Sequence, residues 1–225
     1  LQIQDVFLHD LFNGHSISHH DLGSTIKMAQ KSMDNRLSLQ KEIEEVGDDL
    51  NFILENIKGN AIVVKSNHDE WIDRYLERAG YIYDPDNHYI SLRMAQKMLE
   101  EQDPLKFAIS EYGNVDKLNR IIWLRRDDEF KIGNVELAAH GALGSNGARG
   151  SLQSLEKAYG NCVVGHTHGG AIFRGVFRVG TSTDLQLGYN RGPSSWTKTH
   201  CLVYPNGSRQ LINVIDGKWR LKDDI

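Results

Sequence analysis

Four short segments place side chains that can bind a metal ion directly after a run of apolar residues. They are His9-Asp10, Asn67-His68-Asp69, His140-Gly141 and Gly165-His166-Thr167-His168. Open α/β sheets gather their ligands in the loops beyond strand ends, where residues far apart in the sequence can converge. We therefore expect the four segments to contribute to one site.

The segment Gly165-His166-Thr167-His168 is the most informative. Two histidines one residue apart on a turn can direct their imidazoles at two neighbouring metal ions, and the adjacent glycines permit a tight backbone. A bare His-x-His is more often a pair of surface histidines. Because Asn67-His68 and His140 precede it in the chain, we favour the metal site.

The other segments supply complementary chemistry. The amide oxygen of Asn67 is a hard, neutral ligand, and His68 could protonate a leaving alkoxide or stabilise charge on phosphorus oxygens. Asp69 could instead cap the helix expected over 71–79. Asp10 offers the carboxylate needed between two cations about 3.5 to 4 Å apart. His140 follows an apolar strand, where a neutral, metal-bound imidazole is favoured over a charged one.

Composition excludes several classes of protein. The 225 residues suit one α/β domain, which we expect to span 1–225. No apolar run approaches the roughly 20 residues of a membrane span, so we expect no membrane association. Cys162 and Cys201 form no Cys-x-x-Cys, and a disulfide framework is not indicated. A cytoplasmic location fits these features.

The pattern of apolar residues predicts a helix-rich first half and a strand-rich second half, arranged as layered sheets. Helices are expected within 22–57, over 71–79, within 89–118 with a break at Asp103-Pro104, and over 151–159. Strands are expected over 6–8, 61–64, 121–124, 129–132, 135–139, 161–164, 171–179 and 201–204. Arg120, Arg125 and Arg126 could contact the backbone of a nucleic acid, but a solvated sheet edge is favoured for them. Trp196 either stacks on a base or packs internally.

The order and spacing of the four segments resemble the signature of calcineurin-like metallophosphoesterases. That signature comprises Asp-x-His, Gly-Asp-x-x-Asp, Gly-Asn-His-Asp/Glu, a later His and Gly-His-x-His. The chain carries its last four elements as His9-Asp10-Leu-Phe-Asn13, Ser66-Asn67-His68-Asp69, His140 and Gly165-His166-Thr167-His168. No Asp-x-His precedes Asp10, so we expect that element upstream of Leu1 in a longer chain.

The resemblance implies an α/β (α+β) fold, a four-layer sandwich of two mixed β-sheets flanked by helices. It implies two divalent metal ions, for which we expect Mn²⁺, with Mg²⁺, Fe or Zn as alternatives. It implies that His68 acts on the scissile phosphate, although Asn13 replaces an Asp that orients this histidine in phosphatases. The implied ligands are Asp10 as the bridge, Asn67, His140 and His166 on one ion, and His168 on the other.

Substrate contacts are expected from His19 and His20 after Asp10, and from Arg149 in the glycine-rich loop 141–151. Each has an alternative as an ordinary polar loop residue. The chain looks most like phage-encoded metallophosphoesterases that degrade DNA, in the SbcD-like nuclease branch. The resemblance implies a Mn²⁺-dependent DNase in which hydroxide activated by two metals cleaves phosphodiester bonds.

Two other functions stay open. One is a phosphodiesterase or phosphatase of small nucleotides, and the other is a catalytically inactive scaffold with the phosphoesterase fold. Association into a homo-oligomer is also left open.

Overall fold

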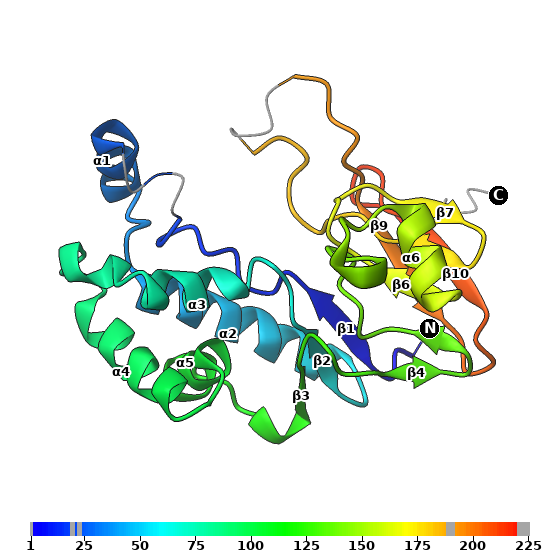
Figure 1. Ribbon diagram of the computed structural model, residues 1–225, viewed down its shortest axis with the longest axis horizontal. Helices are drawn as coiled ribbons and strands as arrows, with labels where there is room; N and C mark the ends of the chain where they lie inside the picture. The colour runs from blue at the N-terminus through cyan, green and yellow to red at the C-terminus, as the bar shows by residue number, and fades with distance from the viewer. Residues whose placement is uncertain (1, 19–20, 22–23, 188–191, 220–225) are drawn as a thin grey trace. The chain divides into compact units, whose positions relative to one another are not determined.

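The computed structural model describes residues 2–18, 21, 24–187 and 192–219 (Figure 1). It is an α/β structure with several sheets, as expected, and it divides into two compact units, Leu1–Leu124 and Arg125–Ile225. A single catalytic domain over 1–225 stays a prediction. No helix among these residues is both long and apolar enough to cross a membrane.

The first unit contains a parallel sheet that is three-stranded over its described residues, in the order β1-β2-β3. The strands are β1 (Val6–His9), β2 (Ala61–Val64) and β3 (Ile121–Leu124). All four residues of β2 are buried, which is why the central strand is continuously apolar. Because the strands are parallel, the loops that follow them begin at the same edge of the sheet.

Helices accompany this sheet, and polar caps decide where they start. Ser24 and Ser38 each accept a hydrogen bond from a backbone N–H three residues on, which divides the region 22–57 into two helices. Asp103 caps the start of the helix Pro104–Tyr112 in the same way, and Pro104 is its first residue. The helices are α1 (Thr25–Met33), α2 (Leu39–Asn56), α3 (Glu70–Glu77), η1 (Gly80–Tyr83), α4 (His88–Leu99), α5 (Pro104–Tyr112) and η2 (Leu118–Arg120).

The core of the first unit lies between the helices and the sheet. Ile43 and Leu50 of α2, Ile72 of α3 and Met94 of α4 are fully buried. Complete burial of each such side chain stabilises the fold by about 1.5 to 3 kcal/mol.

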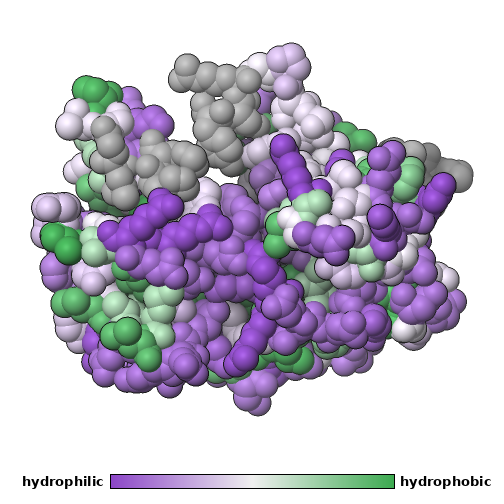
Figure 2. Space-filling view, viewed as in Figure 1, coloured by the Kyte–Doolittle hydropathy of each residue, from purple (hydrophilic) through white to green (hydrophobic). Residues whose placement is uncertain are grey.

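Most of the face drawn in Figure 2 is hydrophilic, and its hydrophobic residues lie in separate patches.

Arg120 does not lie at a solvated sheet edge, so that expectation is wrong. Its guanidinium donates hydrogen bonds to the carbonyl oxygens of Leu54 (3.0 Å), Ile57 (3.0 Å) and Gly59 (2.7 Å from Nε). These carbonyls lie at the end of α2 and in the turn after it, where backbone acceptors lack helical partners. Arg120 therefore fastens the C-terminal end of α2 to the start of β3.

The second unit contains a mixed sheet, five-stranded over the residues described, in the order β4-β5-β6-β8-β7. Strands β5, β6 and β8 are parallel, and β4 and β7 pair antiparallel at the edges. A separate antiparallel pair is formed by β9 and β10. The elements are β4 (Lys131–Ile132), β5 (Val135–Glu136), η3 (Ser145–Gly147), α6 (Leu152–Tyr159), β6 (Cys162–Val164), β7 (Ala171–Phe173), β8 (Val176–Arg178), β9 (Thr199–Val203) and β10 (Arg209–Asn213).

Three details differ from the expected strands. The region 171–179 is a hairpin, because Arg174 (φ 48°) and Gly175 turn the chain between β7 and β8. Strand β10 was not predicted. Strand β5 ends early because the buried Glu136 carboxylate accepts hydrogen bonds from the N–H groups of Phe130, Leu137 and Ala138. These bonds replace a strand ladder over 137–138.

Candidate functional site

The strand-end segments of the first unit meet at one edge of its sheet. Strands β1 and β2 are parallel neighbours in which His9 pairs with Val64. Asp10 follows β1 directly, and Asn67 is the third residue after β2. The structure therefore brings these two predicted ligands to adjacent strand ends, as the sequence predicts.

Asp10 occupies an unusual backbone conformation, with φ 53°. This left-handed region costs a non-glycine residue about 1 to 2 kcal/mol, although Asp tolerates it better than most. Burial raises the pKa of Asp10 to about 6, against the lowering effect of a hydrogen bond with Ser66. Strained backbone and a desolvated carboxylate together are typical of a functional position.

Asp69 joins the two loops and does not cap α3, so the capping alternative is wrong. Its fully buried carboxylate accepts hydrogen bonds from the N–H of Phe12 (3.2 Å) and of Ser66 (2.9 Å). At the start of α3 its side chain makes no capping bond. Burial raises the pKa of Asp69 to about 6, while the hydrogen bonds from Ser66 and Phe12 lower it. Asp69 thus holds together the loops that carry Asp10 and Asn67.

His68 lies against Trp71, with ring centroids 4.4 Å apart and an interplanar angle of 18°. Burial lowers the pKa of His68, and nearby Asp69 and a hydrogen bond to the backbone of Asn13 raise it. The orienting contact expected from an Asp at position 13 is thus made by the main chain. Gly14 follows at φ 67°, where an added Cβ would lie 2.8 Å from the Trp71 ring.

Glu42 of α2 fixes the loop that follows Asp10. Its carboxylate accepts hydrogen bonds from the N–H groups of His15 (2.8 Å) and Ser16 (2.9 Å) and from the Ser16 hydroxyl (2.6 Å). The nearly buried Lys31 donates to the carbonyl of His15 and forms an ion pair with Asp21 at 2.9 Å. Nothing in the local sequence marks Glu42 for this role, because its partners lie 26 and 27 residues away.

In the second unit, His140 and His166 contact each other. Their ring centroids are 5.3 Å apart at an interplanar angle of 77°, and His140 is 4% exposed. They follow β5 and β6, which are parallel neighbours, and Gly165 N–H donates to the carbonyl of His140 at 2.8 Å. Gly141 has φ 103°, and a Cβ there would lie 3.0 Å from Cβ of Val164. The close approach explains the glycine after His140.

His166 and His168 also adopt left-handed conformations, with φ 73° and 60°. The ring of His168 meets that of Trp196 edge to face, 4.3 Å apart at 83°. The carbonyl of His168 accepts a hydrogen bond from Thr197 N–H (2.9 Å), and Arg178 Nε donates to the carbonyl of Gly169 (2.7 Å). The loop 165–169 is therefore held from both sides in a strained conformation.

The predicted substrate contacts are only partly described. His19 and His20 lie outside the described residues. Arg149 is exposed and forms an antiparallel bridge with Leu143, which closes the loop around η3. Its contact with a phosphate stays a prediction.

The donor set suits a divalent metal ion. Carboxylate and amide oxygens with imidazole nitrogens are ligands for Mn²⁺, Fe and Zn. A cation beside Asp10 would also favour the ionised carboxylate that burial disfavours. Within the described ranges, no three His, Cys, Asp or Glu side chains gather as a metal-binding group. The two-metal centre thus stays a prediction.

Comparison with known proteins adds one relative. The chain matches no known family model and no solved structure. Protein A1 of Escherichia phage T5 is 32% identical over 225 residues, which cover 95% of this chain. The chain is similar to a phage protein. It spans 39% of the length of that relative.

Proposed function

We propose that the chain belongs to a metal-dependent phosphoesterase, a Mn²⁺-dependent DNase that hydrolyses phosphodiester bonds. One observation carries the proposal most strongly: the predicted ligands follow neighbouring parallel strands. Asp10 and Asn67 follow one such pair in the first unit, and His140 and His166 follow another in the second. Within each unit, this pairing puts two predicted ligands at adjacent strand ends.

When bound, two divalent ions would supply Lewis acidity that activates water and neutralises charge on the phosphate. The finer fold proposed is the four-layer sandwich of a metallophosphoesterase. Cytoplasmic action, in the host cell for a phage protein, is part of the same proposal. The proposed ligands are Asp10, Asn67, His140, His166 and His168.

The residues of the chain have separable roles in this scheme. Asp69 joins the loops of Asp10 and Asn67 through its hydrogen bonds with Phe12 and Ser66. His68 would contact the scissile phosphate from a position set by Trp71 and the Asn13 backbone. An imidazole that donates one N–H to a carbonyl can donate from its second nitrogen only as imidazolium. Donation from His68 to the leaving oxygen therefore requires its protonated form.

A substrate assay tests the proposal. The protein is incubated with linear DNA, circular DNA or bis-p-nitrophenyl phosphate, each with Mn²⁺, Mg²⁺ or EDTA. We expect Mn²⁺-dependent cleavage of DNA that EDTA abolishes. Cleavage of only the small ester would replace the DNase with a small-phosphodiester hydrolase. Lack of hydrolysis of every substrate with Mn²⁺ would favour the inactive scaffold.

A further inference from the structure

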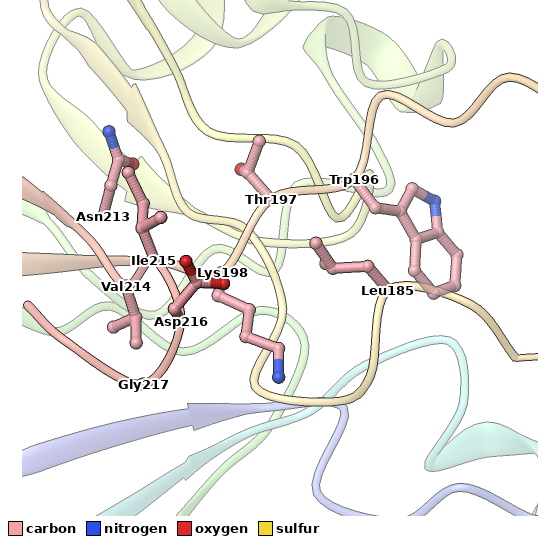
Figure 3. Close-up of a pocket in the computed structure, with 9 residues that line it drawn as sticks. All are labelled: Leu185, Trp196, Thr197, Lys198, Asn213, Val214, Ile215, Asp216 and Gly217. Atoms are coloured by element: carbon pink, nitrogen blue, oxygen red, sulfur yellow. The ribbon is translucent and has the colours of Figure 1, made fainter.

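A cavity of about 440 Å³ lies in the second unit, at the end of the β9–β10 hairpin remote from its turn (Figure 3). Its walls come from 196–198, which precede β9, from 213–217 at the end of β10, and from Leu185. Val214 N–H donates to the carbonyl of Lys198 at 2.8 Å and joins the two segments. Small-molecule pockets have volumes of about 300 to 1,000 Å³, so this cavity has the size of a ligand site.

An aromatic wall places the cavity beside a predicted metal ligand. Trp196 lines the cavity, and its ring contacts that of His168 at 4.3 Å. Figure 3 shows the indole of Trp196 and the side chain of Leu185 on the same side of the cavity. A flat ring bound against Trp196 would therefore lie next to His168.

A chain of hydrogen bonds links Gly170, the residue after the loop 165–169, to the cavity. Gly170 N–H donates to Oγ1 of Thr197 (2.8 Å), and the hydroxyls of Thr197 and Thr199 lie 2.7 Å apart. The Thr199 hydroxyl donates its one hydrogen to Oδ1 of Asn213 (2.7 Å), so the Thr197 hydroxyl donates in the bond between the two threonines. Asn213 lines the cavity. Because Oδ1 accepts from Thr199, hydrogen-bond donation by Asn213 to a ligand would come from its amide nitrogen.

An acceptor is fixed on the side of the cavity opposite Trp196 (Figure 3). Asp216 (φ 49°) and Gly217 (φ 74°) form a two-residue turn, closed by reciprocal hydrogen bonds of 2.9 Å between Ile215 and Lys218. Positive φ at both central residues is the geometry of a type I′ turn, which Asp-Gly favours. The turn holds Asp216 at the cavity (Figure 3). The cavity thus combines an aromatic face with a polar donor and a polar acceptor.

We propose that this cavity binds the nucleobase of a nucleotide or DNA substrate, stacked on Trp196 and contacted at its edge by Asn213 and Asp216. Every base has a π face for stacking and an edge with donors and acceptors. The aromatic side and the polar side of the cavity offer the matching chemistry. The placement of the adjoining phosphate at His168 rests on the proposed function, whereas binding of the base is independent of it.

Tryptophan fluorescence in EDTA tests base binding without catalysis. The full-length protein is titrated with thymidine 5′-monophosphate and with ribose 5-phosphate, which has no base. We expect saturable quenching by the nucleotide alone, and its loss in Trp196→Ala. Trp219, about half exposed and outside the cavity lining, provides the control Trp219→Phe, which should quench as the wild type does.

If Trp196→Ala does not fold, the affinities of two other variants, measured by calorimetry, test the base site. Trp196→Phe, which keeps an aromatic face, should bind thymidine 5′-monophosphate, whereas Asn213→Ala should bind it more weakly. Loss of base stacking in a folded Trp196→Ala protein should weaken binding by roughly 5- to 150-fold. Equal binding of ribose 5-phosphate, or unchanged affinity in both Trp196→Ala and Asn213→Ala, would overturn the base site.

Two further arms identify the source of the base and separate this inference from the proposed function. Tighter binding of a ten-residue thymidine oligonucleotide than of the mononucleotide would assign the base to single-stranded DNA, and equal affinity would assign it to a small nucleotide. Base-dependent binding by a protein that hydrolyses no phosphoester would leave the base site intact and contradict the proposed function. Hydrolysis of nucleotide esters by Trp196→Ala with an unchanged KM would support the proposed function and contradict the base site.

Discussion

The rings of His140 and His166 lie 5.3 Å apart, although each belongs to the loop after a different strand. The hydrogen bond from Gly165 N–H to the His140 carbonyl fixes the two loops against each other. The pair thus provides two neighbouring imidazole donors, as the proposed metal site requires. The contact is the strongest local support for a metal site in the second unit.

The first prediction concerns this histidine pair. Replacing His166 by Ala should remove one nitrogen ligand and lower Co²⁺ affinity by at least tenfold, measured by visible absorption of Co²⁺ added to the metal-free full-length protein. His200→Ala is the matched control, because His200 lies on β9 outside the predicted ligand set. Identical Co²⁺ spectra and affinities for the two variants would contradict the assignment of His166.

The second prediction concerns Asp69. In Asp69→Asn, the amide keeps one acceptor oxygen but turns an NH₂ group toward a second backbone N–H, at Phe12 or Ser66. A buried donor without an acceptor costs about 1 to 3 kcal/mol, so the free energy of unfolding in urea should fall by that amount. The exposed Asp86 provides the control Asp86→Asn, which should change stability by less than about 0.5 kcal/mol. Equal stabilities of the two variants would show that Asp69 does not join the loops.

The third prediction concerns Glu42 and the loop after Asp10. Glu42→Ala removes the acceptor for the N–H groups of His15 and Ser16. Hydrogen exchange at these two amides should become at least tenfold faster, while exchange in β2 stays unchanged. Glu45→Ala, an exposed position on the same helix, should leave the loop protected. Equal protection in both variants would mean that other contacts hold the loop.

The fourth prediction concerns pH and the two thiols. Burial raises the pKa of Cys162 to about 12 and that of Cys201 to about 11. Since the thiolate is the reactive form, alkylation by iodoacetamide at pH 8 should be slow in the folded protein and should accelerate as pH rises. Mass spectrometry of the two cysteine peptides measures the rate, and unfolding in urea provides the fully reactive reference. Equal rates in folded and unfolded protein would contradict the burial of these thiols.

The sequence predicts local features of this fold well. Apolar runs such as 61–64 locate the buried strands, and Asp103-Pro104 locates the break between α4 and α5. The four strand-end segments are also predicted, because a polar ligand directly after an apolar strand is a local pattern. Strand pairing, by contrast, is decided by packing between distant segments.

The remaining features depend on contacts across long stretches of sequence. Asp69 looks like a helix cap, and only its hydrogen bond to Phe12, 57 residues away, reveals its role. In the sequence, Glu42 looks like one of several charges on the polar face of an amphipathic helix, and only its hydrogen bonds to His15 and Ser16 reveal its role. The cavity beside Trp196 needs β10, whose sequence does not have a clear apolar alternation. Local periodicity contains no information on such partners.

The proposed function requires Asp10 and His166 to serve the same metal-dependent reaction. Its most direct test is a double-mutant cycle on Mn²⁺-dependent DNA hydrolysis, with wild type, Asp10→Asn, His166→Ala and the double variant of the full-length protein. We predict that each single variant loses at least about 100-fold in kcat/KM and that the double variant loses little more, because residues acting as a unit are not additive. Wild-type activity of His166→Ala, or full additivity of the two losses, would contradict it.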